Sequence, residues 1–167
     1  GAFKKGDRVK LLPSGFMTTI KAIEINGKNI EEAFSPMSVS VTLKDDLDVS
    51  RGDMIVKENN VPVISQDLDL MICWTDSVNL KPRKKVIIKH TTKECMGMIT
   101  DILYKLDINT LHSIKDFEDF KLNDIGRIKI RSSKPLFYDS YKKNRHTGSI
   151  ILIDPNTNAT IEAGMII

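Results

Sequence analysis

The chain has 167 residues, of which 41% are hydrophobic and 28% are charged, an ordinary composition for a globular protein. A chain of this length can bury one good core or two small ones. The net charge of +3 is too small to indicate nucleic-acid binding by itself, so no nucleic-acid partner is expected.

The first sixty residues predict short β-strands joined by tight turns. Alternating apolar residues between turn signals predict strands at Asp7–Leu12, Thr18–Ile25, Ser38–Leu43 and Met54–Val56. Asn26-Gly27 directly follows the second of these and is the strongest short signal for a β-hairpin. The polar segment Glu58–Pro62 contains a proline that cannot join a central strand, so it is the best domain boundary. The predicted domains are residues 1–60 and 61–167.

The second domain also predicts strands, at Leu68–Trp74, Val86–His90, Lys93–Leu106, Asp124–Arg131, Ser149–Ile153 and Thr160–Met165. The apolar residues of the third strand also fit helical spacing, but Gly97 and several β-branched residues favour a strand. A dense cluster of turn residues, Asp154–Asn158, joins the last two strands into a hairpin. Only Asn109–Lys121 has helix potential, enough for a turn or two. The predicted fold class is therefore all-β, with barrels or sandwiches.

The two cysteines, Cys73 and Cys95, each lie within a strand-like run and fit reduced, buried thiols better than a disulfide framework. No signal peptide and no apolar run long enough to span a bilayer is found, so the cytoplasm is the expected location and no membrane partner is expected. Trp74 ends a strand and is interpreted as barrel core, with an interface anchor as the alternative.

The sequence contains no recognisable catalytic constellation. There is no G-x-x-x-x-G-K-[ST] loop for nucleotide phosphates and no glycine-flanked serine nucleophile. The histidines and cysteines are not at metal-ligand spacing, and the acidic cluster Asp45, Asp46 and Asp48 lacks the glycine and glutamate of a calcium loop. No catalytic, cofactor-binding or metal-binding residue is therefore predicted.

Two basic loops are the candidate sites of partner contact. The first, residues 90–93, offers His90 and Lys93 beside two threonine hydroxyls, and a polar hairpin turn is the simpler interpretation. The second, Tyr141–Gly148, is predicted to be an exposed loop. Its cationic residues are Lys142, Lys143, Arg145 and His146. Arg145 is the strongest candidate, because a guanidinium suits bidentate recognition of a carboxylate or phosphate.

Several short motifs carry a resemblance to a known family. They are G-D-R-V-K-L-L-P-S-G (Gly6–Gly15), E-A-F (Glu32–Phe34), L-D-V-S-R-G-D (Leu47–Asp53), I-C-W (Ile72–Trp74), K-H-T-T-K (Lys89–Lys93), Y-K-L-D-I-N-T-L (Tyr104–Leu111), N-D-I-G-R (Asn123–Arg127) and the run K-P-L-F, D-x-Y, N-R-x-T-G-S, I-L-I-D within Lys134–Asp154. The chain resembles the two C-terminal β-barrel domains of translation-factor-type GTPases such as elongation factor Tu. It is more closely similar to the large, GTP-binding subunit of bacterial sulfate adenylyltransferase.

This resemblance implies two antiparallel β-barrels of the domain II and III type and a non-catalytic role. The family's GTPase domain is not in this sequence, so GTP and Mg²⁺ are expected only there. The implied partners are that GTPase domain and the small catalytic subunit, which makes adenosine 5′-phosphosulfate from ATP and sulfate in sulfate assimilation. The alternatives are the barrels of a translational GTPase that contacts aminoacyl-tRNA, or a free-standing β-barrel interaction module.

The first barrel is expected to lack its opening strands relative to that family. Asp7–Leu12, or a strand that pairs with it, would then lie at an open sheet edge, which can recruit another chain. We expect Val9, Leu11, Ile20 and Ile23 to form an exposed apolar flank there, so that the chain self-associates through its first half.

Overall fold

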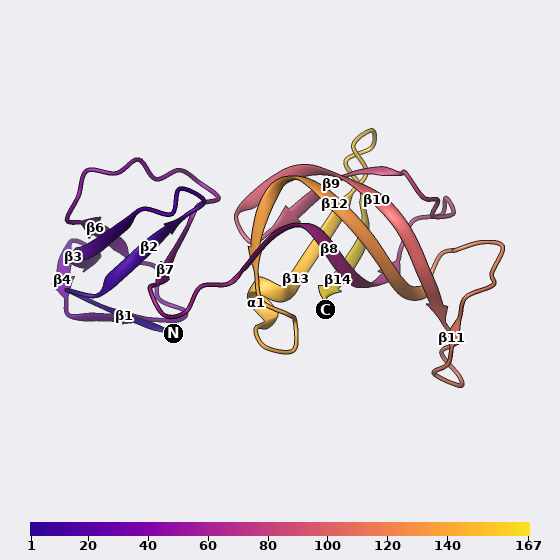
Figure 1. The fold of residues 1–167 in the computed structure, drawn as a ribbon, viewed down its shortest axis with the longest axis horizontal. Coiled ribbons are helices and arrows are strands. Elements are labelled where there is room, and N and C mark those ends of the chain that lie inside the picture. The colour runs from indigo at the N-terminus through magenta and orange to yellow at the C-terminus, as the bar shows by residue number, and fades with distance from the viewer. The chain divides into compact units, whose positions relative to one another are not determined.

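The computed structural model describes all 167 residues and contains fourteen β-strands and one helix of four residues, α1 (Arg145–Gly148) (Figure 1). The all-β prediction is confirmed. The chain divides into two compact units, Gly1–Val61 and Pro62–Ile167, which are described separately. No helix is long and apolar enough to cross a membrane.

The first unit is an open antiparallel sheet with a small second sheet. Its strands are β1 (Ala2–Lys4), β2 (Arg8–Leu12), β3 (Met17–Ile25), β4 (Lys28–Ile30), β5 (Glu32–Phe34), β6 (Ser40–Leu43) and β7 (Met54–Lys57). The main sheet has the order β4-β3-β2-β7, with β6 also paired to β3, whereas β1 and β5 form the two-stranded sheet. The hairpin predicted at Asn26-Gly27 is confirmed, since both residues take the positive φ that a tight β3–β4 turn requires.

An open sheet edge was expected at Asp7–Leu12 or at a strand that pairs with it, and the second alternative holds, because β7 pairs with β2 and ends the sheet. Strand β2 pairs with β3 on one side and β7 on the other, so it is central. Val9, Leu11, Ile20 and Ile23 are at most 3% exposed, because their side chains fill the small core of this unit. The apolar flank that was expected to drive self-association is therefore buried, although the sheet does end in unpaired edges at β4 and β7.

The second unit is a closed barrel of six antiparallel strands. Its strands are β8 (Val63–Trp74), β9 (Lys85–His90), β10 (Lys93–Leu106), β11 (Ser113–Ile114), β12 (Ile125–Tyr138), β13 (Ser149–Ile153) and β14 (Thr160–Ile166). The ring runs β10-β12-β8-β14-β13-β9 and closes where β9 pairs with β10, and β11 is a short addition to β10 outside the ring. Full closure removes the open edges of the sheet.

Strand β10 confirms the prediction of a strand rather than a helix over Lys93–Leu106. Its residues alternate, with Cys95, Gly97 and Ile99 facing the barrel interior while Met96 and Met98 are exposed. A Cβ at Gly97 would lie 2.3 Å from Cδ1 of Ile88, so only glycine leaves room for that side chain.

The helical turns predicted within Asn109–Lys121 are wrong. The Asp107 carboxylate accepts hydrogen bonds from the backbone N–H groups of Asn109 and Thr110, and Leu111 takes a φ of 59°. These features reverse the chain before a helix can start, and Leu111 is 72% exposed rather than on a buried face. Only Phe120 of this segment is fully buried.

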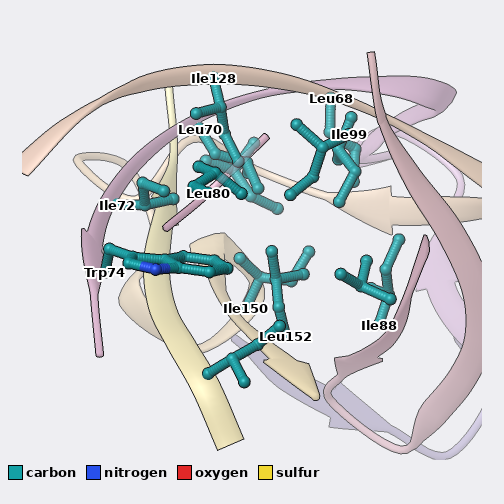
Figure 2. Packing of buried hydrophobic residues seen from close by; sticks show 14 of the residues in the cluster. Leu68, Leu70, Ile72, Trp74, Leu80, Ile88, Ile99, Ile128, Ile150 and Leu152 are labelled. Atoms are coloured by element: carbon teal, nitrogen blue, oxygen red, sulfur yellow. The ribbon is translucent and has the colours of Figure 1, made fainter. Parts of the chain in front are cut away.

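The barrel interior is filled by aliphatic side chains around one indole (Figure 2). Trp74 is fully buried near Ile72, Ile150 and Leu152, and its Nε1–H donates to the carbonyl oxygen of Val78 at 2.9 Å. The interpretation of Trp74 as barrel core is confirmed. A fully buried indole whose N–H is satisfied contributes a large apolar area without leaving a polar group unpaired.

Glu162 is the exception to this apolar interior. It is fully buried on β14, and neither of its carboxyl oxygens has a hydrogen-bond partner. Gly164 provides the space for the carboxyl group, because a Cβ there would lie 2.3 Å from Oε1. Burial raises the pKa of Glu162 well above its usual value, since the charged form would lose its hydration.

We expect Glu162→Gln to stabilise the protein at pH 7 and to have little effect near pH 4. The pKa of Glu162 is higher in the folded than in the unfolded state, so its contribution to stability is full below the unfolded pKa and is lost as the pH rises toward the folded pKa. Thermal unfolding of both proteins across this pH range measures the difference, which should reach roughly 1–3 kcal/mol. Exposed Glu94→Gln is the matched control. A difference between Glu162→Gln and the parent that does not change with pH would contradict a neutral buried carboxyl.

Candidate functional site

The structure brings the two predicted basic loops together. His90 ends β9 and is only 2% exposed, and its Nε2 lies 2.7 Å from the carbonyl oxygen of Thr147 in α1. The bond assigns the proton to Nε2, because a carbonyl oxygen can only accept. Burial lowers the pKa of His90 despite this bond, so the neutral imidazole is favoured. His90 therefore fastens the second loop to the barrel.

The basic loop, Tyr141–Gly148, is more ordered than its sequence predicts. Its last four residues form α1, and the Asn144 side-chain oxygen caps this turn by accepting from the backbone N–H of His146 at 3.1 Å. Asp139 accepts from Lys143 Nζ at 2.6 Å and from the Thr147 hydroxyl at 3.2 Å. The predicted loop is largely exposed, but Arg145–Gly148 forms a helical turn that the sequence did not indicate and that local capping stabilises.

Gly148 lets the two ends of the basic loop meet. A Cβ at this position would lie 2.3 Å from Cα and 2.4 Å from the backbone nitrogen of Tyr141. Backbone atoms cannot move aside as a flexible side chain could. The Tyr141 N–H also donates to the carbonyl oxygen of Ile166 at 2.8 Å, which holds this end of the loop on β14.

The six candidate residues have different environments. Lys142, Lys143, Arg145 and His146 are exposed, and the Arg145 guanidinium lies 5.9 Å from the ring centre of Tyr141. Lys93, by contrast, donates to the carbonyl oxygen of Pro135 at 2.9 Å and lies 4.4 Å from the ring centre of Phe137. Lys93 and His90 therefore support the barrel wall, whereas the other four are presented to solvent.

A small cleft of about 160 Å³ lies where the two loops meet. This basic cleft is lined by Lys89, Thr91, His146, Ser149, Ile150 and Ile151. An ammonium, an imidazole and two hydroxyls converge beside two isoleucines. Such a set can hold an anionic group, such as a carboxylate of a partner protein, but it contains no nucleophile and general base in hydrogen-bond contact.

Sequence reasoning missed the residues that shape this site. Asp139, Thr147 and Gly148 were not singled out, although each belongs to a quoted motif, D-x-Y or N-R-x-T-G-S. The signal available in the sequence was Gly148, which follows Thr147 at the end of the basic loop. Its meaning depends on Tyr141, which only the folded loop places against it.

Nucleotide phosphates are commonly held at the N-terminus of a helix that follows a strand and a glycine-rich loop. The single helix has four residues, so no strand, glycine-rich loop and helix combine into a phosphate cradle. No group of three or more His, Cys, Asp or Glu side chains has a metal-binding arrangement.

Comparison with known proteins defines the class first. Residues 67–167 match the family described as GTP-eEF1A C-terminal domain-like, and the chain belongs to this family. The structure of Sup35 complexed with GDP superposes with a TM-score of 0.88 over 100% of this chain and 41% of that one, at 17% sequence identity. This likeness shows a shared fold.

The sequence relatives are more specific. The chain is 46% identical, over its whole length, to 27% of the bifunctional enzyme CysN/CysC of Mycobacterium tuberculosis. It is 42% identical to 35% of the sulfate adenylyltransferase subunit 1 of Bacteroides fragilis, again over its whole length. The chain is thus homologous to a region of sulfate adenylyltransferase subunit 1, and it spans little more than a third of that protein.

We expect Gly148→Ala to destabilise the second unit by about 1–3 kcal/mol, because the new Cβ overlaps the Tyr141 backbone. Chemical denaturation measures this change. Gly1→Ala is the matched control, since nothing lies within 4 Å of a Cβ there. Equal stability of both variants would show that the loop ends are not held in contact.

Proposed function

We propose that this chain is the non-catalytic C-terminal region of the GTPase subunit of a sulfate adenylyltransferase. In this role it supports the GTP-driven formation of adenosine 5′-phosphosulfate from ATP and sulfate in the cytoplasm. The observation that supports this proposal is the 42% identity to sulfate adenylyltransferase subunit 1 over 100% of the chain. Identity at this level over both units exceeds what the shared fold requires, as the 17% identity to Sup35 illustrates.

The proposed partners are the GTP-binding domain of the same subunit and the small catalytic subunit. The designation of a relative as subunit 1 supports a multi-subunit assembly. The proposed contact surface is the basic loop, because its exposed residues Lys142, Lys143, Arg145 and His146 lie on a short segment fixed by Asp139, His90 and Gly148. A closed barrel is rigid, so a nucleotide-dependent change in what it contacts can bias an assembly between two states.

The second candidate is a barrel region of a translational GTPase that contacts aminoacyl-tRNA. The fold likeness to Sup35 favours it. The modest net charge of +3 does not, because binding to a phosphate backbone depends on several unpaired cations.

A domain exchange tests the proposed function. The matching region of Bacteroides fragilis sulfate adenylyltransferase subunit 1 is replaced by this chain, and a second chimera receives the corresponding region of Sup35. Both are assayed with the Bacteroides small subunit for GTP-stimulated adenosine 5′-phosphosulfate formation. We expect stimulation to survive in the first chimera and to be lost in the second. Retention of stimulation in both, or loss in both together with intact GTP hydrolysis, would contradict a family-specific role.

The isolated chain is expected to bind neither GTP nor Mg²⁺ and to be inactive on ATP and sulfate. Its residues provide no phosphate cradle and no acidic metal cluster. Calorimetric titration with Mg²⁺-GTP should give no saturable heat at micromolar protein concentration. One tight site in this titration would show that the nucleotide contacts are not confined to another domain.

Arg145→Ala in the functional chimera is expected to weaken coupling between GTP hydrolysis and product formation without unfolding the barrel. Loss of a charged hydrogen-bonded contact costs about 2–5 kcal/mol when it is buried in an interface and far less at the rim. Lys129→Ala, which removes an exposed cation from β12, is the control. If the coupling ratio and the affinity for the small subunit are both unchanged, Arg145 does not contact a partner.

A further inference from the structure

The outer wall of the barrel carries a second concave surface, which shares no lining residue with the basic cleft. This methionine groove has a volume of about 500 Å³. It is lined by Gln66, Lys85, Met96, Gly97, Met98, Arg131, Ser132 and Ser133. Met96 and Met98 are 43% and 38% exposed, an unusual placement for two neighbouring apolar side chains on one strand face.

The strand register explains how the groove is composed. Met98 on β10 lies directly opposite Lys85 on β9 and Arg131 on β12, so an apolar side chain stands between two cations. Met96 lies opposite Ile87, which in turn lies opposite Ile153 on β13. Met96, Ile87 and Ile153 thus form an apolar row across three strands. In the neighbouring row, Met98 lies between the cations Lys85 and Arg131.

The groove exists because β12 separates from β10 at this point. Its pairing with β10 ends at Gly97 and Ser132, and its pairing with β8 is interrupted between Arg131 and Leu136. A bulge of this kind bends the strand away from its neighbour. Beside Met96, therefore, no paired residue of β12 continues the outer face of the barrel.

The bulge is fixed by side chains and is not a frayed strand end. Gln66 Nε2 donates to the carbonyl oxygen of Ser132 at 3.2 Å, and the Ser132 hydroxyl donates to that of Lys134 at 2.7 Å. Lys93 Nζ donates to the carbonyl oxygen of Pro135 at 2.9 Å. The carbonyl groups of Ser132, Lys134 and Pro135 thus all have hydrogen-bond partners, which hold the bulge in this conformation.

The lining chemistry indicates the occupant. Methionine side chains are flexible and polarizable, so they adapt to aliphatic or aromatic groups. The lining contains two cations and no carboxylate. The Arg131 ion pair with Asp67, at 3.2 Å, has side chains that are 60% and 70% exposed, and such a pair is weak enough for an incoming carboxylate to replace it.

We propose that the methionine groove binds an acidic peptide segment of a partner protein. An aliphatic or aromatic side chain of that segment packs against Met96 and Met98, while flanking carboxylates pair with Lys85 and Arg131. This inference goes beyond the proposed function, because it rests on the groove alone and holds for whichever protein supplies the segment.

Methionine-methyl NMR of the full chain tests the proposal with defined probes. The blocked peptide Asp-Glu-Leu-Phe-Glu-Asp is titrated into protein labelled with ¹³C at the methyl groups of its seven methionines. We expect the resonances of Met96 and Met98 to shift saturably, with a Kd on the order of 1 mM or tighter. The charge-reversed peptide Lys-Arg-Leu-Phe-Arg-Lys should leave them unshifted, as should Asp-Glu-Ser-Gly-Glu-Asp, which lacks the apolar anchor.

Protein variants locate the effect. Lys85→Glu combined with Arg131→Glu should weaken binding of the acidic peptide by at least about tenfold. Met96→Gln should abolish the saturable shift of the Met98 resonance, and Met98→Gln should abolish that of Met96. Met165→Gln, at a methionine that is 40% exposed on β14, is the matched control and should bind as the parent does. Far-ultraviolet circular dichroism checks that each variant is folded.

Two results would overturn the proposal. One is the absence of saturable shifts at Met96 and Met98 with any of the three peptides. The other is equal binding of the acidic and basic peptides, which would assign the groove to non-specific apolar contact.

Discussion

The structure of the second unit depends on the double pairing of β10. The first half of this strand pairs with β9 and the second half with β12, and Gly97 and Met98 have a partner on both sides. At Gly97 and Met98, β10 is paired with β9 along one edge and with β12 along the other, and this double pairing closes the ring. Gly97 permits it, because any side chain there would overlap Ile88 in the interior. A single backbone position therefore connects closure of the barrel to packing of its core.

Closure also determines where the functional surfaces lie. Because β13 pairs with β9, the C-terminal hairpin lies against the strand that ends at His90. The basic loop precedes that hairpin, so His90 can hold Thr147 although the two residues are far apart in sequence. On the outer wall, the departure of β12 just beyond Gly97 opens the methionine groove. Both surfaces thus follow from which strands are neighbours in the ring.

The structure places two candidate contact surfaces on the barrel, the basic loop with its cleft and the methionine groove. Its buried histidine and glutamate, His90 and Glu162, lie under a loop and inside the barrel respectively, and burial favours the neutral form of each. Four of its exposed basic residues lie on a loop whose ends are fixed. Such an arrangement suits a rigid body that transmits a change of state through contacts, which is the role proposed for it beside a GTP-binding domain.

The sequence by itself determined the local structure and the family. The alternation within Lys93–Leu106, the Asn26-Gly27 turn and the turn cluster before Thr160 each predicted an element that the structure contains. These signals are short-range, because they report the conformation of adjacent residues and which strand face is apolar. The quoted motifs predicted the relationship to sulfate adenylyltransferase in the same way, by local identity.

Only the tertiary structure decided which strands are neighbours, and therefore what is buried. An open edge was expected at Asp7–Leu12 or at a strand that pairs with it. The edge lies at the partner strand β7, so β2 is central and Val9 and Leu11 are core residues. The apolar spacing near Leu111 predicted helical turns, but the side chain has no surface to pack against and the Asp107 turn prevails. Glu162 lies beside a register shift in β14, where both Ile161 and Glu162 are buried, and only closure of the barrel encloses its carboxyl group. Periodicity identifies an apolar face but not the strand that covers it, because that pairing is set by contacts between residues far apart in the chain.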